Sequence, residues 1–547
     1  MTADKPYMSL WCRANVDRPK NPAHSDSGRE HRIFCSRQER GRHQAHECDR
    51  FSPPVQRRIA PRALTTERGV GYLRSSSASD RTRRSEGGAM TDFDAIVIGT
   101  GQAGPSLAFR LASKGMKVAV IERHLVGGTC VNTGCTPTKA LVASAYAAQM
   151  ARRAAEYGVA IAGEIGVDMK RVKERKDAIV AGSRDGLTSA LESAENITLY
   201  RGHARFRSPR EVETGAAPVR ADLIFINVGG RARIPEMPGI DGVPYLANSS
   251  MMEIDFLPRH LIVVGGSYVG LEFGQMYRRF GSEVTIVEME RRLVHREDED
   301  VSAALRDVLE REGVNVRLGA ECVSFAKRDD GIVARLDCTE GAPEVAGSHV
   351  LLAVGRRPNT DDLGLGHAGV KCDERGYIVV DDELRTNVPG IWALGDCNGR
   401  GAFTHTAYND FEVVAANVLE RGRRRVSDRV AAYALYTDPP LGRVGMSVSE
   451  ARKCGRRVLV GERPMTRVAR AIEKGETQGF IRILVDGDSK EILGASLLGT
   501  GCDEAVHAIL DLIYAKAPYT VMQRAMHIHP TVSEMFPTIL GDLKPLD

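Results

Sequence analysis

The sequence predicts an α/β fold with two doubly wound, Rossmann-like domains and a third region at the C-terminal end. Three observations lead to this fold class. A strand, a glycine-rich turn, a helix and a second strand follow one another over residues 93–122, and the same pattern returns over residues 260–288. The chain of 547 residues is long enough for roughly three domains of about 150 residues each. Strands that alternate with helices favour a parallel sheet covered by helices on both faces.

The first unit carries the pattern of a dinucleotide-binding turn. Its apolar strand ends at Gly99, and Gly101 and Gly104 complete a G-x-G-x-x-G turn before the helical stretch 105–115. These glycines allow a tight turn and a close approach of a pyrophosphate to the helix N-terminus. Glu122 ends the next strand, about twenty residues further on, where a carboxylate can accept hydrogen bonds from a ribose. We therefore predict dinucleotide binding at this unit.

The second unit repeats the arrangement with one departure. Its turn consists of Gly265, Gly266, Ser267, Tyr268, Val269 and Gly270. Serine stands where the middle glycine is expected, and its side chain narrows the approach to a pyrophosphate. The second strand ends at Glu288, again in the position of a ribose-binding acid. Two such units imply two dinucleotides, or one dinucleotide and a duplicated fold.

A pair of cysteines follows the first unit. The stretch GGTCVNTGCTPTK, residues 127–139, places Cys130 and Cys135 five residues apart. On a regular helix their Cα atoms would lie roughly 8.7 Å apart, whereas a disulfide rarely spans more than about 7 Å. A bond between them therefore requires a distorted helix, which Gly134 and Pro137 would permit. An accessible disulfide of this kind suits a redox catalyst, but two cysteines in one segment also occur as small buried apolar residues.

Composition argues against several other classes of protein. The chain is 42% hydrophobic and 27% charged, and no run approaches the roughly 18 apolar residues of a membrane-spanning helix. Its 11 cysteines are scattered along the chain, unlike the framework of a small secreted protein, and no apolar signal sequence opens it. We expect a cytoplasmic protein with no membrane or nucleic-acid partner and no metal site.

Residues 1–89 differ from the rest of the chain. They hold 18 Lys and Arg against 10 Asp and Glu, whereas residues 90–547 carry four net negative charges. Almost no apolar periodicity is present, so we expect a disordered leader. Such a leader is also found as a nucleic-acid-binding arm or a transit peptide, although the ten acids argue against both. The stretch SEGGAM would encode a purine-rich ribosome-binding site, so we expect Met90 to be the true first residue.

Six motifs in sequence order give the chain a family resemblance. They are the glycine turn at residues 99–104, GTCVNTGC, the second nucleotide fold, VGRRPN, GIWALGDC and a terminal HIHPTVSE. In this order they resemble the pyridine nucleotide-disulfide oxidoreductases, which include dihydrolipoamide dehydrogenase, glutathione reductase and mercuric reductase. The resemblance covers residues 92–540. It implies a homodimeric FAD enzyme that uses NADH or NADPH and ends in an α+β dimerisation domain.

The resemblance also implies a domain organisation. After the leader, the expected parts are an FAD-binding domain (first part, 90–239), an NAD(P)-binding domain (240–357), the second part of the FAD-binding domain (358–428) and the dimerisation domain (429–547).

By this resemblance the first unit binds FAD. Glu122 would contact the adenosine ribose, Ala204 would lie beside the adenine, and Asp396 would hold the ribityl chain. Where the family more often has an Ala-Thr-Gly turn, this chain has Asn227 and Val228. The local flavin contacts at that turn therefore stay open.

Three further residues are assigned to the flavin ring or its surroundings. Thr129 would contact the cofactor, and Lys139 would sit close to flavin N5 and pair with Glu272. Two solvated charges are the alternative for that pair. The segment 402–410 is expected to begin a helix whose N-terminal dipole faces the flavin pyrimidine, with His405 as a hydrogen-bonded structural histidine.

The second unit would bind the nicotinamide nucleotide, with Gly355 near its end. Tyr268 resembles the family's gate, an aromatic ring that covers the flavin until the nicotinamide displaces it; ordinary core packing is the alternative. Glu288 would repel a 2′-phosphate, so NADH is favoured over NADPH. Arg291 and Arg292 lie close enough in sequence to soften that repulsion.

The resemblance assigns the thiol chemistry to two pairs of residues. Cys135 would face the flavin and Cys130 would meet the substrate. His529 matches the family's acid/base residue, with Glu534 orienting its ring and fixing the tautomer. His527 is expected to be structural.

The final electron acceptor stays open between a disulfide and a soft metal ion. Mercuric reductases, as a group, often carry an additional cysteine pair near the C-terminus, whereas the last cysteine here is Cys502; Cys12, Cys35 and Cys48 form no Cys-x-x-Cys loop. A disulfide is therefore favoured, and mercury(II) reduction is the alternative. A flavin-binding redox sensor without turnover is the hypothesis from another class.

Overall fold

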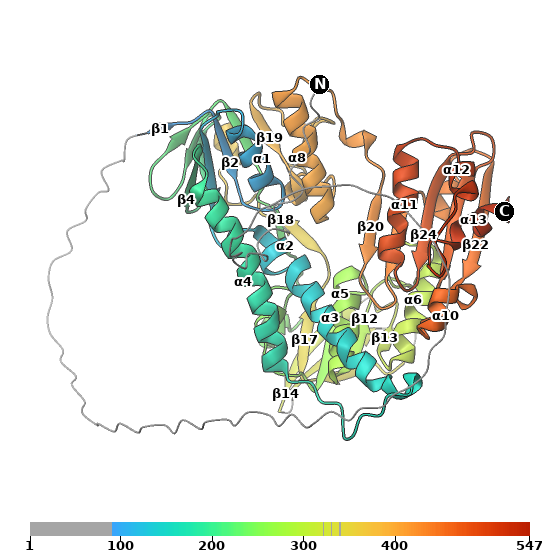
Figure 1. Cartoon of the computed structure of the whole chain (residues 1–547). Coiled ribbons are helices and arrows are strands. Elements are labelled where there is room, and N and C mark those ends of the chain that lie inside the picture. The colour runs from blue at the N-terminus through green and yellow to red at the C-terminus, as the bar shows by residue number, and fades with distance from the viewer. Residues whose placement is uncertain (1–89, 321, 330, 338–340) are drawn as a thin grey trace, which may run out of the picture. The chain divides into compact units, whose positions relative to one another are not determined.

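The structure is a computed structural model, and it describes residues 90–320, 322–329, 331–337 and 341–547. The predictions made for the leader, residues 1–89, lie outside the described residues. Figure 1 colours the described part from blue to red along the chain.

The first doubly wound unit is a parallel sheet of five strands. In order across the sheet these are β19 (Ile391–Ala393), β8 (Leu223–Ile226), β2 (Ala95–Ile98), β3 (Val118–Glu122) and β4 (Ile197–Arg201). Each neighbouring pair runs parallel. β2 and β3 are buried along their whole length, as strands covered on both faces are. Because β19 comes late in the chain, two separate segments complete this domain.

Helices cover this sheet and lead away from it. They are α1 (Ala103–Ala112), α2 (Gly128–Asn132), α3 (Cys135–Arg152), α4 (Met169–Ser193) and α8 (Thr404–Leu419). α1 buries Leu107, Ala108 and Leu111, the spacing of one helix face, and packs against α8. The helix expected from segment 402–410 is thus present as α8.

The second unit is another five-stranded parallel sheet. In order it contains β10 (Tyr245–Leu246), β17 (His349–Leu352), β11 (His260–Val264), β12 (Glu283–Val287) and β13 (Asn315–Arg317), with α5 (Tyr268–Phe280) and α6 (Glu299–Arg311) in the connections. All its pairs are parallel. An antiparallel sheet of β14 (Cys322–Arg328), β15 (Gly331–Asp337) and β16 (Glu344–Gly347) is inserted between β13 and β17. The predicted repeat of one doubly wound unit is confirmed.

The C-terminal region is an antiparallel sheet with helices. Across the sheet lie β20 (Ala432–Leu435), β21 (Leu441–Gly445), β24 (Ile492–Leu498), β23 (Phe480–Asp486), β22 (Val458–Pro464) and β25 (Lys544–Pro545), with α11 (Cys502–Tyr514), α12 (Thr520–Arg524) and α13 (Met535–Gly541) beside it (Figure 1, orange to red). Leu435, Leu441 and Leu498 join the apolar core of the second unit. This is the predicted α+β region, so the predicted fold class is confirmed.

The remaining strands and α-helices are short. They are β1 (Thr91–Asp92), β5 (Arg205–Ser208), β6 (Glu211–Glu213), β7 (Val219–Arg220), β9 (Gly230–Ala232), β18 (Arg356–Pro358), α7 (Leu365–Ala368), α9 (Val448–Ala451) and α10 (Ala469–Glu473). Within the described ranges, no helix is both long and apolar enough to cross a membrane.

Candidate active site

A break between two helices brings the cysteines together. Thr133 and Gly134 separate α2 from α3, and Gly134 has φ −127° and ψ −117°. A Cβ atom at residue 134 would lie 2.8 Å from the Thr129 carbonyl oxygen, so glycine is needed for close packing. Pro137 falls in the first turn of α3, where its missing N–H breaks no helical hydrogen bond. The helix distortion that the cysteine spacing demanded is therefore present.

The two thiols are free in the structure and interact with each other. The Cys130 thiol donates a hydrogen bond to the Cys135 sulfur, and this bond lowers the pKa of Cys135 to about 6. The Thr404 hydroxyl, 3.1 Å from the Cys135 sulfur, and the charge of Lys139 act in the same direction. The same hydrogen bond, together with burial, raises the pKa of Cys130. Cys135 is therefore the residue of the pair that forms a thiolate more readily, and Cys130 keeps its proton.

Two helix N-termini meet at this thiolate. Cys135 is the first residue of the 18-residue helix α3, and Thr404 is the first residue of α8. The positive end of a helix dipole favours an adjacent anion. Thr404 was not identified from the sequence, although its place at the start of a predicted helix was a signal. The sequence does not show that this helix begins against Cys135, because the two residues are 269 positions apart.

The predicted ion pair between Lys139 and Glu272 is confirmed. The Lys139 ammonium lies 2.9 and 3.1 Å from the two carboxylate oxygens of Glu272. Glu272 is buried and also accepts a hydrogen bond of 3.1 Å from the Tyr436 N–H. The Tyr436 ring lies 4.6 Å from the Lys139 ammonium. These contacts exclude the alternative of two solvated charges and fix the ammonium close to the cysteines.

The first glycine turn is closed by Asn227. Gly99 has φ +100°, and a Cβ there would lie 2.4 Å from the Asn227 carbonyl oxygen. A Cβ on Gly104 would lie 2.2 Å from the Gly99 carbonyl oxygen. The Asn227 side-chain amide donates to the Gly101 carbonyl oxygen at 3.1 Å. Asn227, where the sequence departs from the family's usual Ala-Thr-Gly turn, therefore stabilises the glycine turn. Val228 accepts a hydrogen bond at its carbonyl oxygen from the Asn359 side-chain amide.

The carboxylate of Glu122 holds the same turn. It accepts hydrogen bonds from the Thr100 N–H at 3.0 Å, the Thr100 hydroxyl at 2.6 Å and the His124 N–H at 2.8 Å. A carboxylate has about four lone-pair sites, so one remains for a ribose hydroxyl. Ala204 is buried beyond the end of β4. With the glycine turn and the N-terminus of α1, these residues fit the pyrophosphate and ribose of a dinucleotide.

The second turn tolerates its serine for a conformational reason. Gly265 has φ +115°, and a Cβ on Gly270 would lie 1.9 Å from its carbonyl oxygen. Ser267, by contrast, has φ −109° and ψ −172°, an extended backbone that any residue adopts. Glu288 accepts hydrogen bonds from the Gly266 N–H at 2.5 Å and from the Glu290 N–H at 2.9 Å. Both predicted acids thus occupy equivalent places in the two units.

Two assigned cofactor residues lie at the junction of the units. Gly355 has φ +111° with open space where a Cβ would stand, and its carbonyl oxygen accepts from the Arg233 N–H at 2.9 Å. Asp396 is in the short turn Gly395–Asn398. Burial raises the pKa of Asp396, and Arg356 forms an ion pair with it at 3.5 Å. Open space and a partly buried acid suit a cofactor chain.

Tyr268 and His405 both belong to an aromatic cluster. The half-buried Tyr268 ring meets Phe403 and Tyr433 edge-on, and the neighbouring Val269 is exposed. His405 stacks on Phe403 with ring centroids 5.3 Å apart and hydrogen-bonds to the Ala432 carbonyl oxygen at 2.7 Å. Those contacts give His405 the structural environment that we expected.

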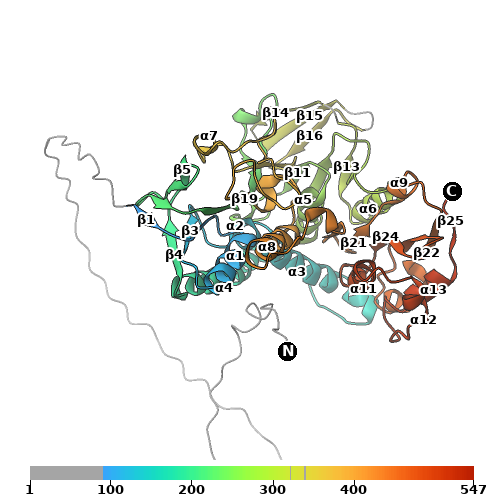
Figure 2. The same cartoon turned by 90° about the horizontal axis from the view of Figure 1, so that it is seen from above.

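His529 and Glu534 form a pair in which the histidine is exposed. The His529 Nδ1–H donates to the Glu534 carboxylate at 2.8 Å, and 74% of the His529 side chain is exposed against 14% of Glu534. The pair belongs to the segment between α12 and α13, and Figures 1 and 2 show these two helices apart from α2 and α3, which carry the cysteines. His527 contacts the Ala525 carbonyl oxygen and the edge of Phe536. One chain therefore does not bring His529 to its own cysteines.

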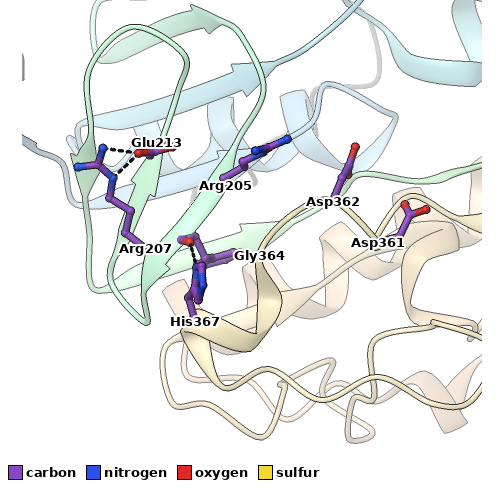
Figure 3. Close-up of a pocket in the computed structure, with 8 residues that line it drawn as sticks. Arg205, Arg207, Glu213, Asp361, Asp362, Gly364 and His367 are labelled. Carbon is purple, nitrogen blue, oxygen red and sulfur yellow. Dashed lines mark hydrogen bonds and ion pairs between the residues drawn. The ribbon is translucent and has the colours of Figure 1, made fainter. Parts of the chain in front are cut away.

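A recess of about 440 Å³ lies elsewhere, over β5, β6 and α7 (Figure 3). Its charged residues are largely paired: Arg207 with Glu213, and Asp362 with Arg123 at 2.6 Å. Since Arg123 follows Glu122, the recess borders the predicted adenosine end of the first unit. It shares no lining residue with the cysteine site. In the described part of the chain, no group of three or more His, Cys, Asp or Glu is arranged to hold a metal ion.

Comparisons with known proteins agree with this arrangement. The family described as "Pyridine nucleotide-disulphide oxidoreductase" matches residues 93–410, and its dimerisation domain matches residues 431–540. A dihydrolipoyl dehydrogenase of Thermus scotoductus is 35% identical over 81% of this chain and 96% of its own length. A mercuric reductase of Streptomyces lividans is 32% identical over 82% of this chain and 95% of its own. The solved Cu(II) complex of the HOCl-induced flavoprotein disulfide reductase RclA from Escherichia coli has a TM-score of 0.76 and 32% identity, and the match covers 83% of this chain and 99% of that one.

Proposed function

Because the chain belongs to the pyridine nucleotide-disulphide oxidoreductases, FAD-dependent enzymes that use NADH or NADPH, we propose that it carries electrons from NADH through FAD and the Cys130/Cys135 pair to a disulfide substrate. The contact between a Cys135 thiolate and a Cys130 thiol, next to the Lys139 ammonium, carries this proposal. Bound FAD would supply the redox chemistry that links hydride transfer from NADH to the two-electron reduction of the Cys130–Cys135 disulfide.

The other predicted site residues would bind and position the two cofactors. The first glycine turn and Glu122 would hold the pyrophosphate and ribose of FAD, and Asp396 its ribityl chain. The second turn and Glu288 would hold the nicotinamide nucleotide. Tyr268 would act as a gate that leaves the flavin face when the nicotinamide enters. Lys139, fixed by Glu272, would place a positive charge beside the flavin and the thiolate.

The two thiols divide the substrate chemistry. Cys130, once deprotonated, attacks one sulfur of the substrate disulfide, forming a mixed disulfide and releasing the first thiol. The Cys135 thiolate then attacks the Cys130 sulfur, which releases the second thiol and re-forms the Cys130–Cys135 bond. Two electrons pass to the substrate, and two protons are taken up by its thiols. The raised pKa of Cys130 means that a base is needed for the first step.

His529 is our candidate for that base. Its Nδ1–H is held by Glu534, which leaves Nε2 facing outward to exchange a proton. Because His529 is exposed and the pair lies apart from the cysteines of its own chain, we propose that it serves the cysteines of a second copy across the dimerisation domain. Activity would then require the homodimer.

A soft metal ion is the second candidate for the electron acceptor, which would make the enzyme a metal-ion reductase. It is favoured by the relative named mercuric reductase and by the relative solved as a Cu(II) complex, since thiolates bind such ions well. A flavin-binding sensor without turnover is the alternative from another class. A steady-state screen with NADH as the electron donor and with lipoamide, glutathione disulfide, quinones, Hg(II) and Cu(II) as acceptors distinguishes the three candidate functions. Turnover with a disulfide supports our proposal, turnover with metal ions alone supports the second candidate, and none at all supports a sensor.

We expect the enzyme to prefer NADH over NADPH by about tenfold or more in kcat/KM, a difference of about 1.4 kcal/mol. Glu288 already accepts two backbone hydrogen bonds, so it is held in place and would repel a 2′-phosphate. Measured kcat/KM values for both nucleotides test this, with Glu288→Gln as the variant that narrows the gap. An NADPH advantage in the unmodified protein would contradict the prediction and implicate Arg291 and Arg292.

Replacing Thr404 by valine should raise the pKa of Cys135 by about one unit, because the thiolate loses one hydrogen-bond donor. The pKa of Cys135 is about 6 in the unmodified protein, so the thiolate fraction near pH 7 should fall in the variant. The ultraviolet absorbance of the thiolate in the reduced protein, taken as a difference from Cys135→Ser at each pH, reports this. Thr404→Ser keeps the hydroxyl, so Cys135 should titrate in this variant as in the unmodified protein. Identical titration curves for Thr404→Val and the unmodified protein would show that the Thr404 hydroxyl does not lower the pKa of Cys135.

A further inference from the structure

The predicted gate rests edge-on against a pair of stacked rings. The centroid of Tyr268 lies 5.8 Å from that of Phe403 and 5.7 Å from that of Tyr433, with ring planes at 83° and 79°. Phe403 and Tyr433 stack at 5.6 Å with planes at 13°. The hydroxyls of Tyr268 and Tyr433 also interact. These rings come from α5, from the residue before α8 and from β20, so they join three parts of the chain.

A buried carboxylate fixes Tyr433. The Tyr433 hydroxyl donates a hydrogen bond to one oxygen of Glu297, whose side chain is 0% exposed. The other oxygen of Glu297 has no hydrogen-bond partner among the described residues. Arg443, itself buried, lies 3.6 Å from that oxygen and compensates its charge. Because a buried carboxylate is costly without hydrogen bonds, the Tyr433 hydroxyl is held firmly at this position.

The carboxylate is anchored to the second nucleotide turn. The Glu297 N–H donates to the Val294 carbonyl oxygen at 2.7 Å, and the Val294 N–H donates to the Gly266 carbonyl oxygen at 2.9 Å. Tyr268 and Glu297 therefore both stand on the predicted nicotinamide domain, and Tyr433 reaches between them from the C-terminal region. On the other side of the stack, Phe403 directly precedes Thr404, which contacts Cys135.

We propose that Tyr433, fixed by Glu297, is a catch that holds the Tyr268 ring in its closed position and thereby sets how readily the nicotinamide reaches the flavin. This rests on the gate role given to Tyr268 in the proposed function. A nucleotide that needs the open gate binds with an apparent Kd raised by the inverse of the open fraction. Weakening the catch raises that fraction. Tyr433 and Glu297 are thus positioning residues that act through Tyr268.

Rapid mixing of the FAD-loaded enzyme with NADH tests the catch. In Tyr433→Phe the ring stays but the hydroxyl is lost, and we expect the NADH concentration for half-maximal flavin reduction to fall by about threefold to tenfold. The limiting rate of flavin reduction should change by less than about twofold, since the groups that touch the reacting atoms are unaltered. Glu297→Gln keeps an acceptor for the Tyr433 hydroxyl and should give a smaller shift in the same direction. Tyr245→Phe, at an exposed tyrosine of the predicted nicotinamide domain, is the matched control and should give no shift.

A double-variant cycle separates a catch from general loosening. In a Tyr268→Ala background, Tyr433→Phe should no longer change half-saturation, because the ring that it holds is gone. An unchanged half-saturation in both Tyr433→Phe and Glu297→Gln would overturn the catch, and so would a Tyr433→Phe effect that persists in full without Tyr268. Should Tyr433→Phe fail to fold with FAD, Glu297→Gln in the two backgrounds decides alone. Failure of the proposed function is seen separately, as an unmodified enzyme whose flavin neither NADH nor NADPH reduces, and it would overturn the catch as well.

Discussion

Cys130→Ser should lose turnover with a disulfide substrate by at least about a thousandfold, because a serine hydroxyl cannot replace the attacking thiolate. NADH should still reduce the flavin of this variant, since Cys130 is assigned to the substrate and not to the nucleotide. Cys135 should keep its thiolate character, because the serine hydroxyl can donate the hydrogen bond that the Cys130 thiol donates, and Thr404 and Lys139 remain. Steady-state turnover with lipoamide, together with anaerobic rapid mixing with NADH, measures the two steps separately.

The control for this variant is Cys372→Ser, which removes an exposed thiol outside the site and should keep full turnover. Cys135→Ser should also lose disulfide turnover, but in that variant the thiolate absorbance should disappear as well. Undiminished disulfide turnover in Cys130→Ser would contradict the assignment of this residue. Loss of flavin reduction by NADH in Cys130→Ser, by contrast, would mean that Cys130 also supports the reaction between NADH and flavin, which this assignment does not allow.

Local patterns in the sequence predicted those parts of the site that local backbone geometry determines. The glycines at 99, 104 and 265 are needed because a Cβ there would clash with nearby backbone, and that requirement is visible in a short motif. The same holds for the break between α2 and α3, where the cysteine spacing demanded distortion and Gly134 supplied it.

Contacts between distant segments were harder to predict without a family resemblance. Thr404 and Cys135 are 269 residues apart, and Tyr433 and Glu297 are 136 apart. Nothing near Glu297 in the sequence indicates that its carboxylate is buried under a tyrosine of another domain. Ser267 shows the opposite limit: its motif suggested a defect in the turn, whereas its extended backbone shows that glycine is not required there for conformational reasons.

His529→Ala should slow disulfide turnover by about a hundredfold or more, the usual range for loss of a general acid or base, and leave NADH reduction of the flavin nearly intact. The reason is that Cys130 has a raised pKa and needs a base, whereas hydride transfer from the nucleotide does not involve the thiols. Rapid mixing with NADH and then with a disulfide resolves the two half-reactions. His527→Ala is the control, because His527 contacts only the backbone of Ala525 and the ring of Phe536 in the described interactions, and it should turn over normally.

The same variant tests the dimer and the acceptor. Mixed dimers of His529→Ala and Cys130→Ser chains should keep one active site of two. When His529 serves the partner's cysteines, one of the two sites combines an intact cysteine pair with an intact histidine. In such a dimer, the Cys130→Ser chain supplies His529 to the cysteines of the His529→Ala chain. If His529 instead served its own chain, each site would lack one group and the mixture would be inactive.

Unchanged disulfide turnover in His529→Ala, or robust Hg(II) reduction by an unmodified enzyme that reduces no disulfide, would move the assignment to the metal-ion reductase, in which the His529 and Glu534 pair has no evident proton to transfer.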